Sequence, residues 1–165
     1  MTEFIYLHGF ASGPNSNKAR VFKERFEELS IPIHVPDLQQ NDFENLTLSR
    51  QIELVQAILD REEHKNFGLV GSSMGGYLAS IIAQTRESVK ALYLMAPGFN
   101  FLKRWRKKLD LSKTAASLIP VFHYRYNKEV LLNTHLFQDA EKWESLSLDR
   151  DIPTVIAHGL HDETV

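Results

Sequence analysis

Short runs of apolar residues alternate along this sequence with stretches in which apolar residues recur every three or four positions. The short runs predict buried β-strands, and the wider spacing predicts amphipathic helices. The strands are expected at residues 4–7, 31–35, 67–70, 89–95 and 153–157. The helices are marked by Ala19, Phe22, Phe26 and Leu29 after a Ser16 cap, by Leu48, Ile52, Val55 and Leu59, and by residues 77–84.

This alternation predicts a single α/β domain over residues 1–165. Strands that are apolar throughout are typical of a mostly parallel sheet covered by helices on both faces, a three-layer α/β/α arrangement. Functional sites in such sheets lie beyond the carboxyl ends of the strands. The strand ends to inspect are therefore His8-Gly9, Gly71-Ser72-Ser73, Ala96-Pro97 and His158-Gly159.

The connection between the fourth and fifth expected strands is unusually long. It is much longer than a single crossover helix requires, and it is rich in aromatic residues. We expect residues 99–150 to form a helical lid or cap inserted over the strand ends. The alternative is an elaborated crossover whose aromatic side chains pack on the sheet.

Composition and charge exclude several functional classes. The net charge is −2 with both signs mixed, which gives no general attraction for nucleic acid or acidic membranes. The sequence has no cysteine, so disulfides, thiolate zinc sites and a thiol nucleophile are excluded. The N-terminus lacks the basic start and long apolar core of a signal peptide, and no apolar run is long enough to span a bilayer. These features favour a cytoplasmic protein without stable membrane insertion.

The segment Gly71-Ser72-Ser73-Met74-Gly75 matches the pattern G-x-S-x-G, with Ser73 at its centre. The serine of such a motif is raised above the sheet by a sharp, strained strand-to-helix turn. The crowding of that turn requires very small residues two positions before and after the serine. An apolar strand is expected before the motif and a helix after it, so Ser73 is predicted to be a nucleophile. Ser72 is the weaker candidate, because only Ser73 has the symmetric glycine spacing.

Two backbone N–H groups are candidates for holding the oxyanion of a tetrahedral intermediate, a role that needs preorganised donors. One is the Met74 N–H, directly after the nucleophile. The other is the Phe10 N–H, in the loop after the first strand, where Gly9 allows the chain to turn inward. His8 could itself be catalytic, but the favoured interpretation is a buried histidine bonded to a backbone carbonyl.

The last expected strand is followed by a loop that contains Asp162 and Glu163. Asp162 comes after Ser73 in the chain and lies just beyond a strand end, where a carboxylate could orient a histidine base. Glu163 is the backup acid, since the turn after Gly159 would aim its side chain differently. The alternative for Asp162 is a solvated loop carboxylate without a role in catalysis.

Three segments of the sequence resemble the small bacterial esterases of the α/β-hydrolase superfamily, particularly the YqiA-like group. They are residues 6–10 (YLHGF), 71–77 (GSSMGGY) and 158–165 (HGLHDETV), and the resemblance covers essentially the whole sequence. It implies the α/β-hydrolase fold, with Ser73 as nucleophile, Asp162 as triad acid, and Phe10 and Met74 as oxyanion donors. It also implies hydrolysis of carboxylic esters or thioesters without a metal or organic cofactor.

The base histidine of such an enzyme is missing from this sequence. The resemblance implies one more strand after the acid and a histidine in the loop beyond it, so we expect the last strand, a helix and the triad histidine beyond Val165. His161 adjoins the acid itself, and His123 and His135, in the long connection, are weak alternatives. Without its base, Ser73 is a weak nucleophile at neutral pH, and these 165 residues alone are expected to have little activity.

The sequence therefore predicts a serine esterase that cleaves small or medium acyl esters through an acyl-enzyme intermediate. Thioesterase, lipase-like or peptidase activity on the same scaffold is the alternative, and a non-catalytic binding protein that retains the fold is another. The expected partner is a small-molecule ester rather than nucleic acid. His158 and His161 are three residues apart, but no further ligands cluster near them in the sequence, so no metal site is expected.

The strongest charge cluster is residues 103–108, with the sequence KRWRKK. Such a cluster could attract anionic substrates or a membrane surface. The favoured interpretation is the solvated face of a helix whose Phe101, Leu102, Trp105 and Leu109 pack inward.

Overall fold

The computed structural model describes residues 2–61, 65–109 and 118–162. The main sheet contains β1 (Thr2–Leu7), β2 (Ile33–His34), β3 (Asn66–Ser72), β4 (Val89–Met95) and β7 (Thr154–Ala157). The helices are α1 (Asn17–Glu28), α2 (Leu48–Arg61), α3 (Met74–Thr85), α4 (Phe101–Lys108) and α5 (His135–Glu144). A separate hairpin is formed by β5 (Leu118–His123) and β6 (Lys128–Asn133).

The main sheet is parallel throughout, with the strand order β2-β1-β3-β4-β7, which confirms the predicted parallel sheet. All five predicted strands are present, but β2 is shorter than expected. Pro32 has no N–H to donate to a sheet, and its carbonyl accepts a hydrogen bond from the Phe4 N–H (3.0 Å) just before β2 begins. β7 is an edge strand, and its Val155 and Ile156 are 59% and 53% exposed.

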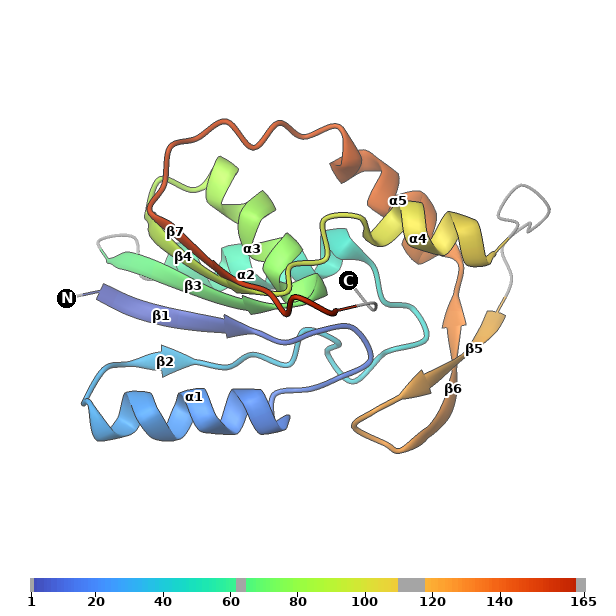
Figure 1. The fold of residues 1–165 in the computed structure, drawn as a ribbon, viewed down its shortest axis with the longest axis horizontal. Helices are drawn as coiled ribbons and strands as arrows, with labels where there is room; N and C mark the ends of the chain where they lie inside the picture. The colour runs from blue at the N-terminus through green and yellow to red at the C-terminus, as the bar shows by residue number, and fades with distance from the viewer. Residues whose placement is uncertain (1, 62–64, 110–117, 163–165) are drawn as a thin grey trace.

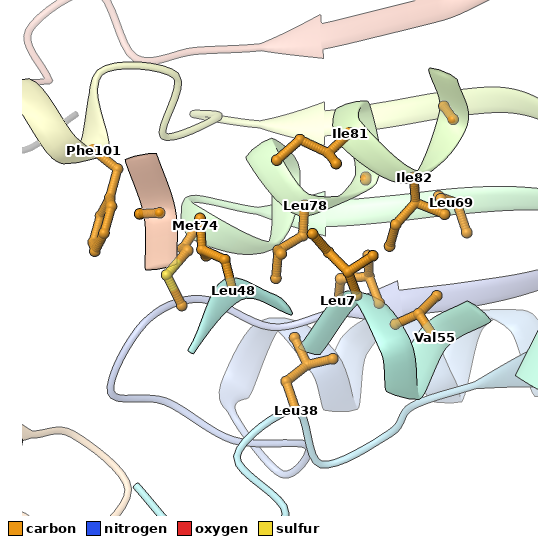
Figure 2. Packing of buried hydrophobic residues seen from close by; sticks show 14 of the residues in the cluster. Leu7, Leu38, Leu48, Val55, Leu69, Met74, Leu78, Ile81, Ile82 and Phe101 are labelled. Carbon is orange, nitrogen blue, oxygen red and sulfur yellow. The ribbon is translucent and has the colours of Figure 1, made fainter. Parts of the chain in front are cut away.

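Helices cover both faces of the sheet (Figure 1). On one face, Ala19 of α1 packs with Tyr6 of β1 and Val70 of β3. On the other face, the larger core cluster includes residues of α2 and α3, among them Val55 and Ile82 (Figure 2). The layers are therefore helix, sheet and helix, as predicted. Within the described part of the chain, no helix combines the length and apolar character that crossing a bilayer requires.

The long connection between β4 and β7 contains α4, the β5–β6 hairpin and α5, gathered near the carboxyl ends of the strands (Figure 1). The hairpin was not predicted, since only helix-like segments were expected here. Phe101 and Phe137 of the two helices stack at a centroid distance of 6.2 Å and belong to the larger core cluster. The hairpin is joined to the loop after β1 by a hydrogen bond from the Tyr124 N–H to the Ala11 carbonyl (2.9 Å).

Candidate active site

Ser73 stands at the turn that joins β3 to α3. Its backbone has φ 52° and ψ −118°, and a positive φ of this kind in a residue with a side chain costs about 1–3 kcal/mol. The Ser73 N–H donates to the Met95 carbonyl (2.9 Å), while the Ser73 carbonyl accepts from the N–H groups of Gly76 (2.9 Å), Tyr77 (3.2 Å) and Gly98 (2.9 Å). These bonds hold the strained turn. The strand, the sharp turn and the helix are present as the motif predicted.

The glycines of the motif are required by close backbone contacts. A Cβ on Gly71 would lie 2.5 Å from the Gly75 carbonyl oxygen. A Cβ on Gly75 would overlap the Leu7 carbonyl group and lie 2.7 Å from the His8 carbonyl oxygen. Any larger residue at either position would force the start of α3 away from the strands, so the symmetric glycine spacing has a steric cause in this structure.

The loop after β1 lies against the same turn. A Cβ on Gly9 would be 3.3 Å from the Ser72 carbonyl oxygen and 3.4 Å from the Ser73 Cβ. The next residue, Phe10, packs its ring 5.5–5.9 Å, centroid to centroid, from the rings of Phe43, Phe101 and Trp105. This packing holds Phe10 at the cavity that Ser73 also lines.

Met74 is the first residue of α3 and lines that cavity too. The first N–H groups of a helix have no acceptor within the helix, so the Met74 N–H is a candidate donor to a ligand. The positive end of the helix dipole lies at the same place and favours negative charge there.

Two cavities meet at Ser73. The larger has a volume of about 720 Å³, which is within the range of small-molecule sites. Its aromatic lining residues are Phe10, Phe101, Trp105, Phe122 and Tyr124. The smaller has a volume of about 280 Å³, and Lys18 and Ser72 are among the residues that line it. A further cavity of about 520 Å³, beside β2, contains none of the predicted site residues.

Ser72 differs from Ser73 in its surroundings. Ser72 is 7% exposed and is absent from the lining of the larger cavity. Its hydroxyl oxygen accepts a long hydrogen bond from the Lys18 ammonium (3.4 Å). Ser73 lines both cavities. The geometry therefore favours Ser73 over Ser72 as the residue that meets a ligand.

His8 is a buried structural residue, as the favoured interpretation predicted. Its Nδ1 donates to the Gly9 carbonyl (3.0 Å), and its Nε2 accepts from the Leu38 N–H (3.1 Å). Burial lowers the pKa of the imidazole below the usual histidine value. Both ring nitrogens are engaged by the backbone, which favours the neutral form of the ring.

Asp162 lies in the turn after β7, where its N–H donates to the Gly159 carbonyl (3.2 Å). Its Oδ2 is 3.8 Å from the Nε2 of His158, and both side chains are partly exposed. β7 pairs in parallel with β4, so the turn after β7 lies at the same end of the sheet as Ser73, where the parallel strands have their carboxyl ends. Asp162 lines neither of the two cavities at Ser73. Glu163, the backup acid, lies outside the described residues.

The other candidate histidines do not line the cavities at Ser73 either. His123 is fully buried, with its Nε2 2.9 Å from the Gln39 Oε1 and its ring stacked on Tyr126 (4.3 Å). His135, at the start of α5, and His161, beside the predicted acid, are both exposed. No histidine of the described ranges lines either cavity at Ser73.

Sequence reasoning missed the contribution of the hairpin to the site. Val121, Phe122 and Tyr124 line the larger cavity, although only helical segments were expected in this region. Asn127 has φ 50° in the turn between β5 and β6, and asparagine is one of the few residues that tolerate this conformation. The asparagine and the apolar run at residues 118–122 were local signals that could have indicated a hairpin.

The sequence has a detectable family match. The sequence model of UPF0227, an uncharacterised protein family, matches residues 3–165. A protein of Mycoplasma pneumoniae (strain ATCC 29342 / M129 / Subtype 1) with the provisional name esterase/lipase 2 is 38% identical over 100 residues. The match covers 57% of this chain and 37% of that relative, so this chain matches less than two fifths of the relative's length.

Solved structures of similar fold support the architecture. A provisionally assigned hydrolase from Agrobacterium vitis S4 has a TM-score of 0.74 at 21% identity, covering 94% of this chain and 67% of its own. Mouse alpha/beta hydrolase domain-containing protein 10 has a TM-score of 0.72 at 24% identity, covering 98% of this chain and 70% of its own. Similarity at this identity establishes the fold alone, and the α/β-hydrolase fold expected from the three sequence segments is confirmed.

Proposed function

Because this chain belongs to the uncharacterised protein family UPF0227 and has the α/β-hydrolase fold, we propose that it is the core of a serine esterase with Ser73 as nucleophile. The esterase/lipase name of the Mycoplasma relative favours the same reaction class. The proposed substrate is a small or medium acyl ester that enters the larger cavity, and no metal or organic cofactor takes part.

The single observation that carries the proposal is the strained turn at Ser73. A positive φ in a serine is costly, yet this one is held by several backbone hydrogen bonds and by glycines that nothing larger could replace. The turn presents Ser73 to a cavity of about 720 Å³ at the end of a helix. A strained residue that the surrounding structure over-determines, at the wall of a cavity, is typical of a reacting group.

The proposed reaction is a two-step acyl transfer. A base removes the proton of the Ser73 hydroxyl as its oxygen attacks the ester carbonyl carbon, and the carbonyl electrons move to the oxygen. The N–H groups of Phe10 and Met74 donate to that oxyanion. The bond to the alcohol oxygen then breaks, and the alcohol leaves with the proton that the base returns. Water, activated by the same base, attacks the acyl-serine and releases the acid.

A histidine base and an acid that orients it complete the proposed triad. The resemblance to the YqiA-like esterases implies that the base is a histidine beyond Val165, and we adopt this assignment. Asp162 is proposed to orient that histidine, since it lies in the turn after β7 at the same end of the sheet as Ser73. Residues 99–150 are proposed to act as the cap, because α4 and β5 supply much of the cavity wall.

Fluorophosphonate labelling of the full-length protein tests the proposal. Wild type and Ser72→Ala should be labelled, and Ser73→Ala should not, since the reagent reacts only with an activated serine. Ser72→Ala is the matched control, because it removes the neighbouring hydroxyl. An unlabelled wild type would favour a non-catalytic binding protein. A Ser73→Ala variant labelled as well as wild type would show that a residue other than Ser73 is the nucleophile.

A further inference from the structure

The basic run at residues 103–108 lies on α4, and its members have different surroundings. Arg106 pairs with Glu141 and Glu144 of α5, each at 3.0 Å. Arg106 therefore forms exposed ion pairs between α4 and α5, which agrees broadly with the solvated helix face that was expected for this run. Arg104 and Lys107 instead line the larger cavity, together with Ser73.

Among the described residues, the charged ones that line the two cavities at Ser73 are cations. Arg104 and Lys107 line the larger cavity and Lys18 the smaller, and no aspartate or glutamate of the described ranges lines either. The chain as a whole has a net charge of −2, so the charged residues of these linings are opposite in sign to the net charge of the chain. A cleft lined by one sign of charge concentrates ligands of the opposite sign.

The rest of the larger cavity is mainly aromatic, with Phe10, Phe101 and Trp105 packed against one another along α4. Such a lining suits an apolar body, and a guanidinium with a neighbouring ammonium suits a carboxylate or a phosphate group. We infer that Arg104 and Lys107 bind the anionic group of an ester whose apolar body fills the cavity and whose carbonyl lies at Ser73. This inference rests on the proposed esterase function and adds the substrate class to it.

A matched pair of esters tests the inference on the full-length protein. p-Nitrophenyl hexanoate is neutral, and the mono-p-nitrophenyl ester of adipic acid has the same acyl length with a terminal carboxylate. For wild type, kcat/KM should be higher for the anionic ester. In the Arg104→Gln/Lys107→Gln variant, the ratio of anionic to neutral kcat/KM should fall roughly 10- to 100-fold, since charge-assisted hydrogen bonds are lost.

Lys103→Gln is the matched control. Lys103 is exposed on the same helix and lines neither cavity, so its removal changes the charge of α4 by one without touching the proposed site. The ratio should stay at the wild-type value in this variant. The ratio of anionic to neutral kcat/KM should also stay at the wild-type value in Lys18→Gln. If Lys18→Gln lost the preference for the anionic ester instead, the anion would lie in the smaller cavity, and the assignment to α4 would be overturned.

A binding measurement separates this inference from the proposed function. Full-length Ser73→Ala is titrated with hexanoate, hexyl phosphate and hexanol, and binding is followed by tryptophan fluorescence because Trp105 lines the cavity. Both anions should bind more tightly than hexanol. The Arg104→Gln/Lys107→Gln substitutions should weaken anion binding at least roughly tenfold. The tighter of the two anions identifies a carboxylate or a phosphate as the preferred group.

The results distinguish failure of the proposed anion site from failure of the proposed esterase function. Anion binding that depends on Arg104 and Lys107, with neither ester hydrolysed by wild type, would support the anion site and overturn the esterase. Hydrolysis of both esters, with a ratio that the double variant leaves unchanged, would overturn the anion site and leave the esterase standing. Equal binding of hexanol and the two anions would also overturn the anion site.

Discussion

Gly75, at the start of α3, lies directly against the carbonyl group of Leu7, the last residue of β1. β1 is the neighbour of β3, the strand from which Ser73 leaves the sheet. Because Gly75 has no side chain, α3 can approach β1 this closely. The contact joins the segments that carry the two proposed oxyanion donors. Met74 directly precedes Gly75, and Phe10 lies in the loop that follows Leu7.

The first prediction concerns that contact. Gly75→Ala should lower the free energy of unfolding by about 1–3 kcal/mol, because an inserted methyl group must displace backbone atoms rather than a flexible side chain. Urea denaturation measures the loss. Gly159→Ala is the matched control, since the nearest atom to its Cβ would be 3.6 Å away, and it should cost about 0.5 kcal/mol or less. Equal stability of the two variants would show that the Gly75 contact is not a constraint.

The second prediction concerns Arg150, which precedes β7. Its guanidinium donates to the carbonyls of Ala83, Arg86, Glu87 and Val89, at 2.6–3.2 Å. The last carbonyls of a helix have no partner within the helix, and Arg150 supplies one at the end of α3.

Arg150→Met keeps the length of the side chain and removes all of these bonds. It should lower the free energy of unfolding by about 2–4 kcal/mol, measured by urea denaturation. Arg150→Lys should fall between wild type and the methionine variant, since an ammonium cannot reproduce the fork of a guanidinium. Arg20→Met, at an exposed residue of α1, is the control. If Arg150→Met were no more destabilising than Arg20→Met, the capping role would be wrong.

The parts of this molecule that local patterns specify could be predicted from the sequence. The strands of the sheet follow from continuous apolar runs, and the turn at Ser73 follows from a motif of five residues, although the contact that requires Gly75 is made with Leu7 of β1. The fold class and the position of the candidate nucleophile belong to this group. The α/β arrangement and the strained turn are both present in the structure.

The parts that depend on distant segments could not be predicted. β5 carries an apolar run, LIPVF at residues 118–122, but Pro120 interrupts it and most positions of the hairpin are exposed or partly exposed, so the run alone does not indicate that it pairs with β6. Within the basic run, Arg106 is paired with Glu141 of α5 and Arg104 lines the cavity, and this difference depends on how α4 packs against the rest of the chain. The link between Ser49 and Asp139 joins residues 90 positions apart, and no local pattern contains it.

The third prediction concerns pH and His8. Burial lowers the pKa of His8 in the folded protein. Below the ordinary histidine pKa of about 6.5, the unfolded chain takes up a proton that folded His8 resists. The free energy of unfolding should therefore fall as the pH is lowered from about 7 to about 5, by at most about 1.4 kcal/mol per pH unit for this residue. The fall should end once the pH passes below the pKa of the folded state.

Urea denaturation across this pH range measures the effect. His8→Gln should be less stable than wild type at pH 7.5 but should lose less stability on acidification. Burial also lowers the pKa of His123, so part of the pH dependence should persist until His123→Gln is added. A wild-type stability that is constant or rises between pH 7 and 5 would contradict this account of both histidines.

The fourth prediction concerns Asp139 of α5, which ties that helix to the start of α2. Its carboxylate accepts from the Ser49 N–H (2.8 Å) and the Ser49 hydroxyl (2.7 Å), and the Ser49 oxygen accepts from the Trp143 indole N–H (3.1 Å). Burial alone would raise the pKa of Asp139, but these bonds and the Lys142 ammonium outweigh it and hold the pKa below the usual value. The negative charge also lies at the positive end of the α2 dipole.

Asp139→Asn should lower the free energy of unfolding at pH 7 by about 1–3 kcal/mol, because it removes the charge that these donors stabilise. A carboxylate with a depressed pKa stabilises the fold above its ordinary pKa of about 4, and this contribution is lost as the pH falls further. The difference between wild type and variant should therefore shrink below about pH 4, as measured by urea denaturation at pH 7, 5 and 3.5. Asp60→Asn, at an exposed pair with Arg86, should cost about 0.5 kcal/mol or less. An Asp139→Asn loss no larger than this control, or one that grows on acidification, would show that the carboxylate does not secure α5 to α2.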